Sequence, residues 1–141
     1  MAGQFVTFKI ADATYGVPVM HVQETLGHQA RTFVPQAPRG VAGLVNLRGQ
    51  VVLTLDLRPR LGLPALPPEA EPMMVVVEVD GEAISLLVDS VGEVLEVADA
   101  QFEGVPDTLD PAVRDLIVGV YKLEQGLLLA LDIRAAAAVT V

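Results

Sequence analysis

The chain contains one stretch of sequence twice. Residues 43–58, GLVNLRGQVVLTLDLR, align without a gap to residues 119–134, GVYKLEQGLLLALDIR, with six of sixteen positions identical. Upstream of these, residues 8–26 align to residues 77–95. Both copies of a duplicated segment meet the same folding requirements. Positions kept in both copies are therefore assigned to the fold, and positions found in one copy only are candidates for function.

The repeat divides the chain into two related halves, 5–61 and 73–134. The connection 62–72, GLPALPPEAEP, holds four prolines and is interpreted as a linker, because proline cannot donate to a sheet ladder. Each half is close to the lower size limit for independent folding. We therefore expect the halves to share a core within a single domain, 1–141, with an exchange of strands between them left open.

Composition excludes several classes of function. The net charge of −9 disfavours a continuous basic face for nucleic acid or anionic lipid. Cysteine is absent, which excludes disulfides, thiolate metal sites and a cysteine nucleophile. There is neither a signal-peptide pattern nor an apolar run of about 20 residues. A soluble, cytoplasmic protein without a cofactor is expected.

Alternating apolar residues predict strands that are joined by short turns. Four hairpins are expected, and the third is extended by a further strand at 91–97. The hairpins pair 5–10 with 14–19, 41–47 with 51–56, 73–79 with 83–88, and 117–123 with 127–132. Helices are expected only at 111–116, after the cap Asp110, and through the alanines 135–138. This pattern predicts an all-β barrel or sandwich, and its duplication predicts two small barrels.

Two residue pairs are shared by the repeats. Asp56 and Asp132 each follow a buried-looking strand, so catalytic carboxylates and helix caps are both conceivable. Duplication and the capping position favour caps. Arg58 and Arg134 recur in the same way and are assigned to structural packing or pairing.

The segment Asn46-Leu47-Arg48-Gly49 differs between the repeats, since the second repeat has Lys122 and Glu124 where the first has Asn46 and Arg48. An arginine fork suits a carboxylate or a pair of carbonyls, whereas the alternative is an ordinary solvated turn. Glu24 precedes this segment in the same half. We therefore expect an ion pair between Glu24 and Arg48.

Enzyme chemistry finds no support in the sequence. His21 and His28 are the only histidines, and no third ligand accompanies them, so neither a metal site nor a catalytic triad is indicated. Phosphate-binding glycine motifs are absent. A small-ligand-binding β-barrel remains as the alternative to a protein that binds other proteins.

Several motifs together resemble the CheW-like domains of bacterial chemotaxis. The family's order and spacing are matched by Tyr15-Gly16, Val22-Gln23-Glu24, Asn46-Leu47-Arg48-Gly49 and Asp56-Leu57-Arg58. The closing segment 109–133 is similar as well, so that the resemblance covers residues 5–137. Pro18 departs from the family pattern and requires an edge position or a bulge.

The resemblance implies two intertwined SH3-like five-stranded β-barrels and a non-enzymatic scaffold. Such proteins couple the cytoplasmic tips of methyl-accepting chemoreceptors to the regulatory domain of the CheA histidine kinase, at membrane-associated arrays. Other CheW-like domains are further possible partners, and a non-flagellar chemosensory pathway is an alternative setting. The matching residues on the receptor side are Val22, Glu24, Gly43, Asn46 and Arg48. The expected kinase contacts, exposed apolar residues at a barrel end, are Val17 and Val19.

Overall fold

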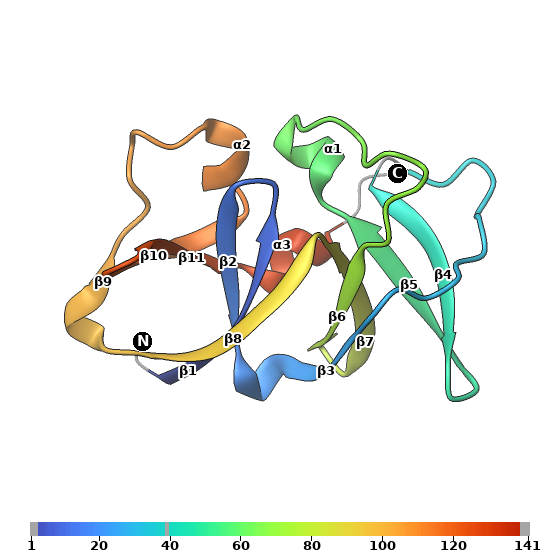
Figure 1. Ribbon diagram of the computed structural model, residues 1–141, viewed down its shortest axis with the longest axis horizontal. Coiled ribbons are helices and arrows are strands. Elements are labelled where there is room, and N and C mark those ends of the chain that lie inside the picture. Colours follow the sequence, from blue (N-terminus) through green and yellow to red (C-terminus); the bar gives the residue numbers. More distant parts are fainter. Residues whose placement is uncertain (1–2, 39, 139–141) are drawn as a thin grey trace.

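The computed structural model describes residues 3–38 and 40–138, which form two antiparallel-rich sheets side by side (Figure 1). The first sheet has the strand order β8-β1-β2-β11-β10-β9. Its strands are β1 (Gly3–Ile10), β2 (Ala13–Pro18), β8 (Ser90–Val97), β9 (Phe102–Glu103), β10 (Ile117–Leu123) and β11 (Gly126–Leu131). The second sheet has the order β3-β6-β7-β5-β4. Its strands are β3 (Val22–Leu26), β4 (Val41–Leu47), β5 (Gln50–Asp56), β6 (Met73–Val79) and β7 (Glu82–Val88).

All four predicted hairpins form, and each sheet takes one hairpin from each repeat. In the first sheet, β2 of the first repeat pairs in parallel with β11 of the second, with Tyr15 opposite Leu129. In the second sheet, β5 pairs in parallel with β7, with Leu55 opposite Leu86. The two sheets are therefore related by an approximate two-fold exchange, in which β1, β2, β10 and β11 correspond to β6, β7, β4 and β5.

Short helices connect the strands and differ slightly from the predicted ranges. They are η1 (Val19–His21), α1 (Arg58–Leu61), η2 (Asp99–Gln101), α2 (Pro111–Arg114) and α3 (Ile133–Ala137). The strand predicted to reach Val19 ends at Pro18, because the chain turns into η1 there. Likewise, α2 ends at Arg114 and does not reach Leu116.

Both aspartates accept backbone hydrogen bonds at the start of a helix, Asp132 as the N-cap of α3 and Asp56 from the position before Leu57, the N-cap of α1. Asp132 Oδ1 accepts hydrogen bonds from the backbone N–H groups of Arg134 and Ala135, both at 3.1 Å. Asp56 Oδ1 accepts one from the N–H of Arg58 at 2.9 Å. These carboxylates satisfy donors at the start of α3 and α1, which have no partner within their own helices. Their recurrence in both repeats is thereby explained by the fold.

Pro18 lies at an allowed edge. It is the last residue of β2 and pairs on one side with Phe5 of β1, whereas the pairing of β2 with β11 ends at Gly16. Because no neighbouring strand needs an N–H at position 18, the proline costs no ladder hydrogen bond.

Three clusters of buried apolar side chains fill the molecule. The largest is shared by the two sheets and contains Phe8, Tyr15 and Val17 from the first and Leu55, Val75 and Leu86 from the second. A smaller cluster of Phe5, Tyr121 and Leu128 lies on the opposite face of the first sheet, and one of Val45, Met74 and Leu87 lies on that of the second. Each sheet thus curls around its own small core and also contributes to a common one. This arrangement agrees with the expectation that neither half has enough core alone.

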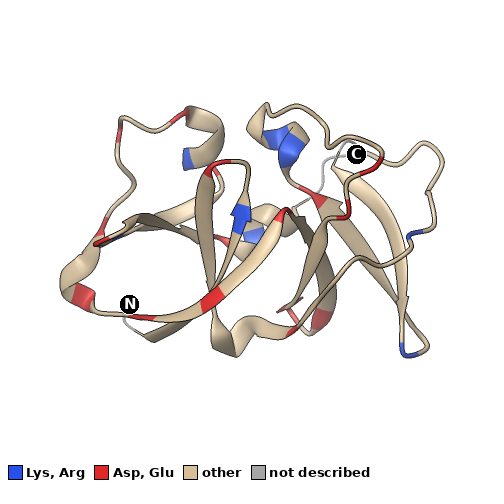
Figure 2. Cartoon of the chain, viewed as in Figure 1, with Lys and Arg blue, Asp and Glu red and all other residues tan. Residues whose placement is uncertain are grey.

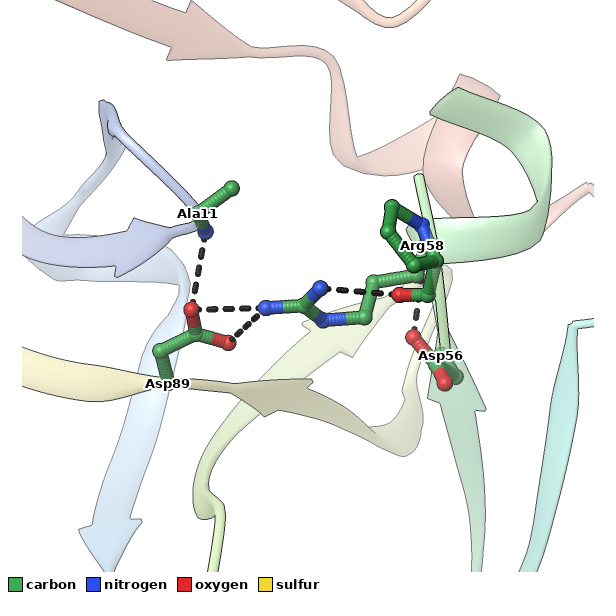
Figure 3. Close-up of polar contacts among 5 residues, drawn as sticks. Ala11, Asp56, Arg58 and Asp89 are labelled. Carbon is green, nitrogen blue, oxygen red and sulfur yellow. Dashed lines mark hydrogen bonds and ion pairs between the residues drawn. The ribbon is translucent and has the colours of Figure 1, made fainter. Parts of the chain in front are cut away.

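Arg58 ties the two sheets together on one side (Figure 3). Its Nη2 donates to both carboxylate oxygens of Asp89, at 2.8 and 2.7 Å, and Asp89 also accepts from the N–H of Ala11 at 2.8 Å. Asp89 lies between β7 of the second sheet and β8 of the first. A second tie comes from α1, where Arg60 Nη1 donates to the carbonyls of Ala135 and Ala136 in α3, at 2.7 and 3.1 Å. The structural role predicted for Arg58 is therefore confirmed.

Across residues 3–38 and 40–138, no helix combines the length and the apolar character that a membrane-spanning segment requires.

Candidate functional site

Glu24 and Arg48 form the predicted ion pair at one end of the second sheet. Both terminal nitrogens of Arg48 contact the carboxylate of Glu24, Nη1 at 3.2 Å and Nη2 at closer range. The pairing of Val22 with Val77 and of Glu24 with Val76 skips a residue of β3, which marks a bulge beside Glu24. The side chain of Arg48 is 71% exposed and that of Glu24 only 25%. A partner can therefore reach the guanidinium while the carboxylate orients it from below.

The turn that carries Arg48 is held by Asn46. Arg48 and Gly49 both have positive φ, 53° and 86°, as a tight two-residue hairpin turn requires. The side-chain Oδ1 of Asn46 accepts the N–H of Gly49 at 3.0 Å. Asn46 was singled out because the second repeat lacks it. This exposed residue therefore stabilises the turn conformation that presents Arg48.

Gly43 serves close packing of the backbone. A Cβ built at Gly43 would lie 2.7 Å from the carbonyl oxygen of Thr32, and its φ is +131°. This space admits the segment that bridges Thr32 to Leu44. The equivalent Gly119 makes room for β9 in the same way, since its Cβ would lie 2.5 Å from the Phe102 ring. Gly43 thus has a structural role in addition to any contact with a partner.

Val22 is the fifth residue matched to the receptor side. It begins β3 and is partly buried, and it packs against the shared core. Its neighbour Gln23 joins the ion pair to a larger hollow, because its Nε2 donates to Glu78 at 3.3 Å. Gln23 also lines a small polar depression of about 250 Å³, together with Glu24 and Arg48.

The larger hollow, which we call the inter-sheet cleft, has a volume of about 610 Å³. Its apolar side chains come mainly from the first sheet, and its polar groups come from the β6–β7 turn, η1 and the start of α3. The lining residues used below are Phe5, Tyr121, Ile133, Glu78, Asp80 and Arg134. Phe5 and Phe102 each contact Tyr121 edge to face, with centroids 5.3 and 5.1 Å apart. Such a cleft, apolar with a few convergent polar groups, is typical of a binding site.

An ion pair crosses the cleft. Arg134 Nη2 lies 2.7 Å from Asp80 Oδ1, and the two side chains are 73% and 60% exposed. Arg134 is the second residue of α3, which follows the first sheet, whereas Asp80 is in the β6–β7 turn of the second sheet. The repeat assigned Arg134 to the fold alone, and neither Asp80 nor the aromatic lining was singled out. Only the pairing of the sheets brings these residues to one cleft.

Acidic residues outnumber basic ones, 18 to 9, and are spread along the strands and connections of both sheets (Figure 2). The exposed guanidiniums of Arg48 and Arg134 are therefore local positive points on a chain of net charge −9.

The two residues predicted to contact a kinase differ in accessibility. Val17 is fully buried in the shared core, so the expectation of an exposed contact there is wrong. The alternation of β2 explains this, because Tyr15 and Val17 share the face that packs against the second sheet. Val19 lies beyond the strand in η1 and is 37% exposed, and its neighbour Met20 is 82% exposed.

Comparison with known proteins gives a consistent answer. The model of the CheW-like domain matches residues 4–139. The chain belongs to the CheW-like family. A chemotaxis protein CheW from Rhizobium meliloti strain 1021 is 33% identical over 121 residues, which is 86% of this chain and 78% of that protein. Another from Bacillus subtilis strain 168 is 26% identical over 132 residues, 94% of this chain and 85% of its own.

A solved structure, the scaffolding protein TtCheW from Thermoanaerobacter tengcongensis, superposes with a TM-score of 0.82 and 26% identity, covering 94% of this chain and 90% of the other. The predicted family and the fold of two small barrels are confirmed by these matches. With them the predicted function class, a chemotaxis coupling scaffold, is confirmed as well.

Proposed function

We propose that this protein joins the cytoplasmic tip of a chemoreceptor to a CheA-type histidine kinase at membrane-associated arrays. The observation that carries the proposal is the continuity of two features on one surface. The exposed Arg48 with its partner Glu24, and the apolar inter-sheet cleft, are connected through the hydrogen bond between Gln23 and Glu78. A receptor tip is a helical hairpin, and an apolar groove flanked by charges suits the docking of an amphipathic helix.

The expected division of labour follows from the chemistry of the surface. Burial of apolar side chains in the cleft supplies affinity, because each buried branched side chain contributes about 2 kcal/mol. Arg48, oriented by Glu24, supplies register and orientation through a charge-assisted hydrogen bond. Asn46 and Gly43 act through the backbone that presents Arg48, and Val22 anchors β3 to the core.

For the kinase we propose a contact at Val19, which is accessible and does not line the inter-sheet cleft, although Pro18 and His21 beside it do. The protein would act by raising the effective concentration of kinase at the receptor. A signal is transmitted only if the bound geometry favours one state of the kinase over another. No reaction is required of the scaffold itself.

The test is a binding assay with two partners, a chemoreceptor cytoplasmic fragment and the regulatory domain of the CheA kinase. Arg48→Glu is expected to weaken receptor binding about tenfold or more and to leave kinase binding unchanged. Val19→Asp is expected to do the reverse. Lys122→Glu, which alters an exposed ion pair outside the cleft, is the matched control. The proposal is wrong if the unaltered protein binds neither partner.

A further inference from the structure

The two arginines of the repeat occupy equivalent places but have different surroundings. Each follows an aspartate that accepts its backbone N–H, and each pairs with a carboxylate, Arg58 with Asp89 in the connection between the sheets and Arg134 with Asp80 in the β6–β7 turn. The side chain of Arg58 is 10% exposed, whereas that of Arg134 is 73% exposed. The aliphatic residue before each arginine shows the same contrast, since Leu57 is buried and Ile133 is only half-buried. One copy of the site is sealed and the other is open.

The chain itself seals the first copy. After α1, Gly62 adopts a left-handed conformation, with φ of 69°, and turns the backbone toward the side chain of Arg58. Leu63 then packs against the shared core. Pro64 offers its carbonyl oxygen to Arg58 Nη1 at 2.9 Å (Figure 3). The cover of a sealed site thus consists of one aliphatic side chain and one oxygen acceptor for the guanidinium.

Within the described part of the chain, no segment covers Arg134 in this way. Ala138, which corresponds to Gly62, has an extended conformation, with φ of −73° and ψ of 107°. The end of α3 is instead tied to Arg60 of α1. Residues 135–138 are absent from the lining of the inter-sheet cleft, which lies open beside Arg134 and Ile133.

We propose that the partner helix in the cleft supplies what Leu63 and Pro64 supply in the sealed copy. It places an aliphatic side chain against Ile133 and the aromatic wall, and it offers an oxygen acceptor to Arg134. Carbonyls inside a helix are already bonded within the helix. The acceptor is therefore a side-chain carboxylate or carboxamide next to the aliphatic residue. This inference rests on the proposed function and names the partner chemistry that the cleft selects.

Asp80 competes with that acceptor. It holds the guanidinium of Arg134 at the cleft through an exposed ion pair that contributes little to stability. A partner oxygen has to displace the Asp80 carboxylate from one guanidinium nitrogen of Arg134, or share the guanidinium with that carboxylate. Removing the charge of Asp80 is therefore expected to strengthen binding, whereas a purely structural role for the pair predicts no gain.

The experiment measures the affinity of the full chain for a chemoreceptor cytoplasmic fragment in three variants. Arg134→Glu is expected to weaken binding about tenfold or more, because it removes the donor for the partner acceptor and, opposite a carboxylate, adds a like charge. Asp80→Asn is expected to strengthen binding about two- to fivefold, the range set by an exposed ion pair. Asparagine tolerates the positive φ of 52° at this turn position. Lys122→Glu breaks the exposed ion pair with Glu103, neither residue of which lines the cleft, and is expected to change nothing.

The outcomes separate this inference from the proposed function. If the unaltered protein binds no receptor fragment, the proposed function fails. If it binds but Arg134→Glu binds equally well, the cleft acceptor is excluded. If Asp80→Asn weakens binding, Asp80 contacts the partner directly and the assignment to Arg134 is wrong. A thermal melt of each variant excludes unfolding as the cause, and Asp80→Asn keeps the inference testable should Arg134→Glu fail to fold.

Discussion

Arg48 in the β4–β5 turn forms an ion pair with Glu24 in the bulged strand β3, and both terminal guanidinium nitrogens contact the carboxylate. The pair lies at the surface, where its own contribution to stability is below about 1 kcal/mol. Its value to the protein lies in holding one exposed cation in a fixed orientation.

The first prediction reverses this pair. Arg48→Glu should weaken receptor binding, because two carboxylates would then repel each other and the cation would be lost. Adding Glu24→Arg should restore part of the affinity by restoring the pair with the opposite polarity. Isothermal titration with a receptor fragment measures both steps. Equal affinities of the single and the double variant would contradict a role for the pair in orientation.

The second prediction compares the two repeated arginines. Arg58→Ala should lower the free energy of unfolding by about 3 kcal/mol, because it leaves the carboxylate of Asp89 without its cation in a mostly buried network. Arg134→Ala should cost less than about 1 kcal/mol, since its pair with Asp80 is exposed. Urea unfolding followed by circular dichroism gives both values. Similar losses of stability for the two variants would show that the buried pair of Arg58 and Asp89 stabilises the fold no more than the exposed pair of Arg134 and Asp80.

The third prediction concerns Gly43 and Gly119, each of which lies at a register shift in the pairing of its hairpin. Gly43→Ala and Gly119→Ala should each destabilise the protein by about 1–3 kcal/mol, because a Cβ would meet a backbone carbonyl at 2.7 Å in both cases. Gly104→Ala is the matched control, since no atom lies within 4 Å of its built Cβ. Thermal melting distinguishes the three variants. A stable Gly43→Ala protein that no longer binds receptor would instead place Gly43 in direct contact.

The fourth prediction separates Val17 from Val19. Val17→Ala should cost about 2 kcal/mol of stability, because it leaves a cavity in the shared core. Val19→Asp should leave the melting temperature nearly unchanged and weaken kinase binding. Paired melting and binding measurements decide this. Unaltered kinase binding by a folded Val19→Asp variant would move the kinase contact away from η1.

The fifth prediction concerns alkaline pH. Burial raises the pKa of Tyr15 above the ordinary value of 10.0, and burial followed by the charge of Asp99 raises the pKa of Tyr121. The folded state thus disfavours the phenolate. Both tyrosines contribute full stability below pH 10, and this contribution is lost as the pH rises from the ordinary pKa toward the folded-state values. Chemical unfolding between pH 8 and about 11 should show this fall, and it should be smaller in Tyr15→Phe.

Local chemistry explains which features could be predicted from the sequence. The hairpins follow from alternating apolar residues and from turn residues such as Asp80-Gly81, where positive φ occurs at both positions. The caps Asp56 and Asp132 follow from their place before a helical turn. The ion pair of Glu24 and Arg48 could be predicted because both residues belong to the same half of the chain. The turns and caps depend on contacts close in sequence, and the ion pair joins residues 24 positions apart within one repeat.

The sequence by itself therefore determined the strands, the turns, the duplicated scaffold and the family. Only the tertiary structure decided which hairpins share a sheet and which copy of the repeated arginine is covered. Exchange of hairpins buries Val17 and sets Asp80 beside Arg134, because a strand's buried face depends on the sheet it faces. The linker covers the first copy of the site, at Arg58. No described segment covers the second copy, at Arg134, which lines the cleft. Such an asymmetry arises from packing between distant segments, which periodicity and spacing do not encode.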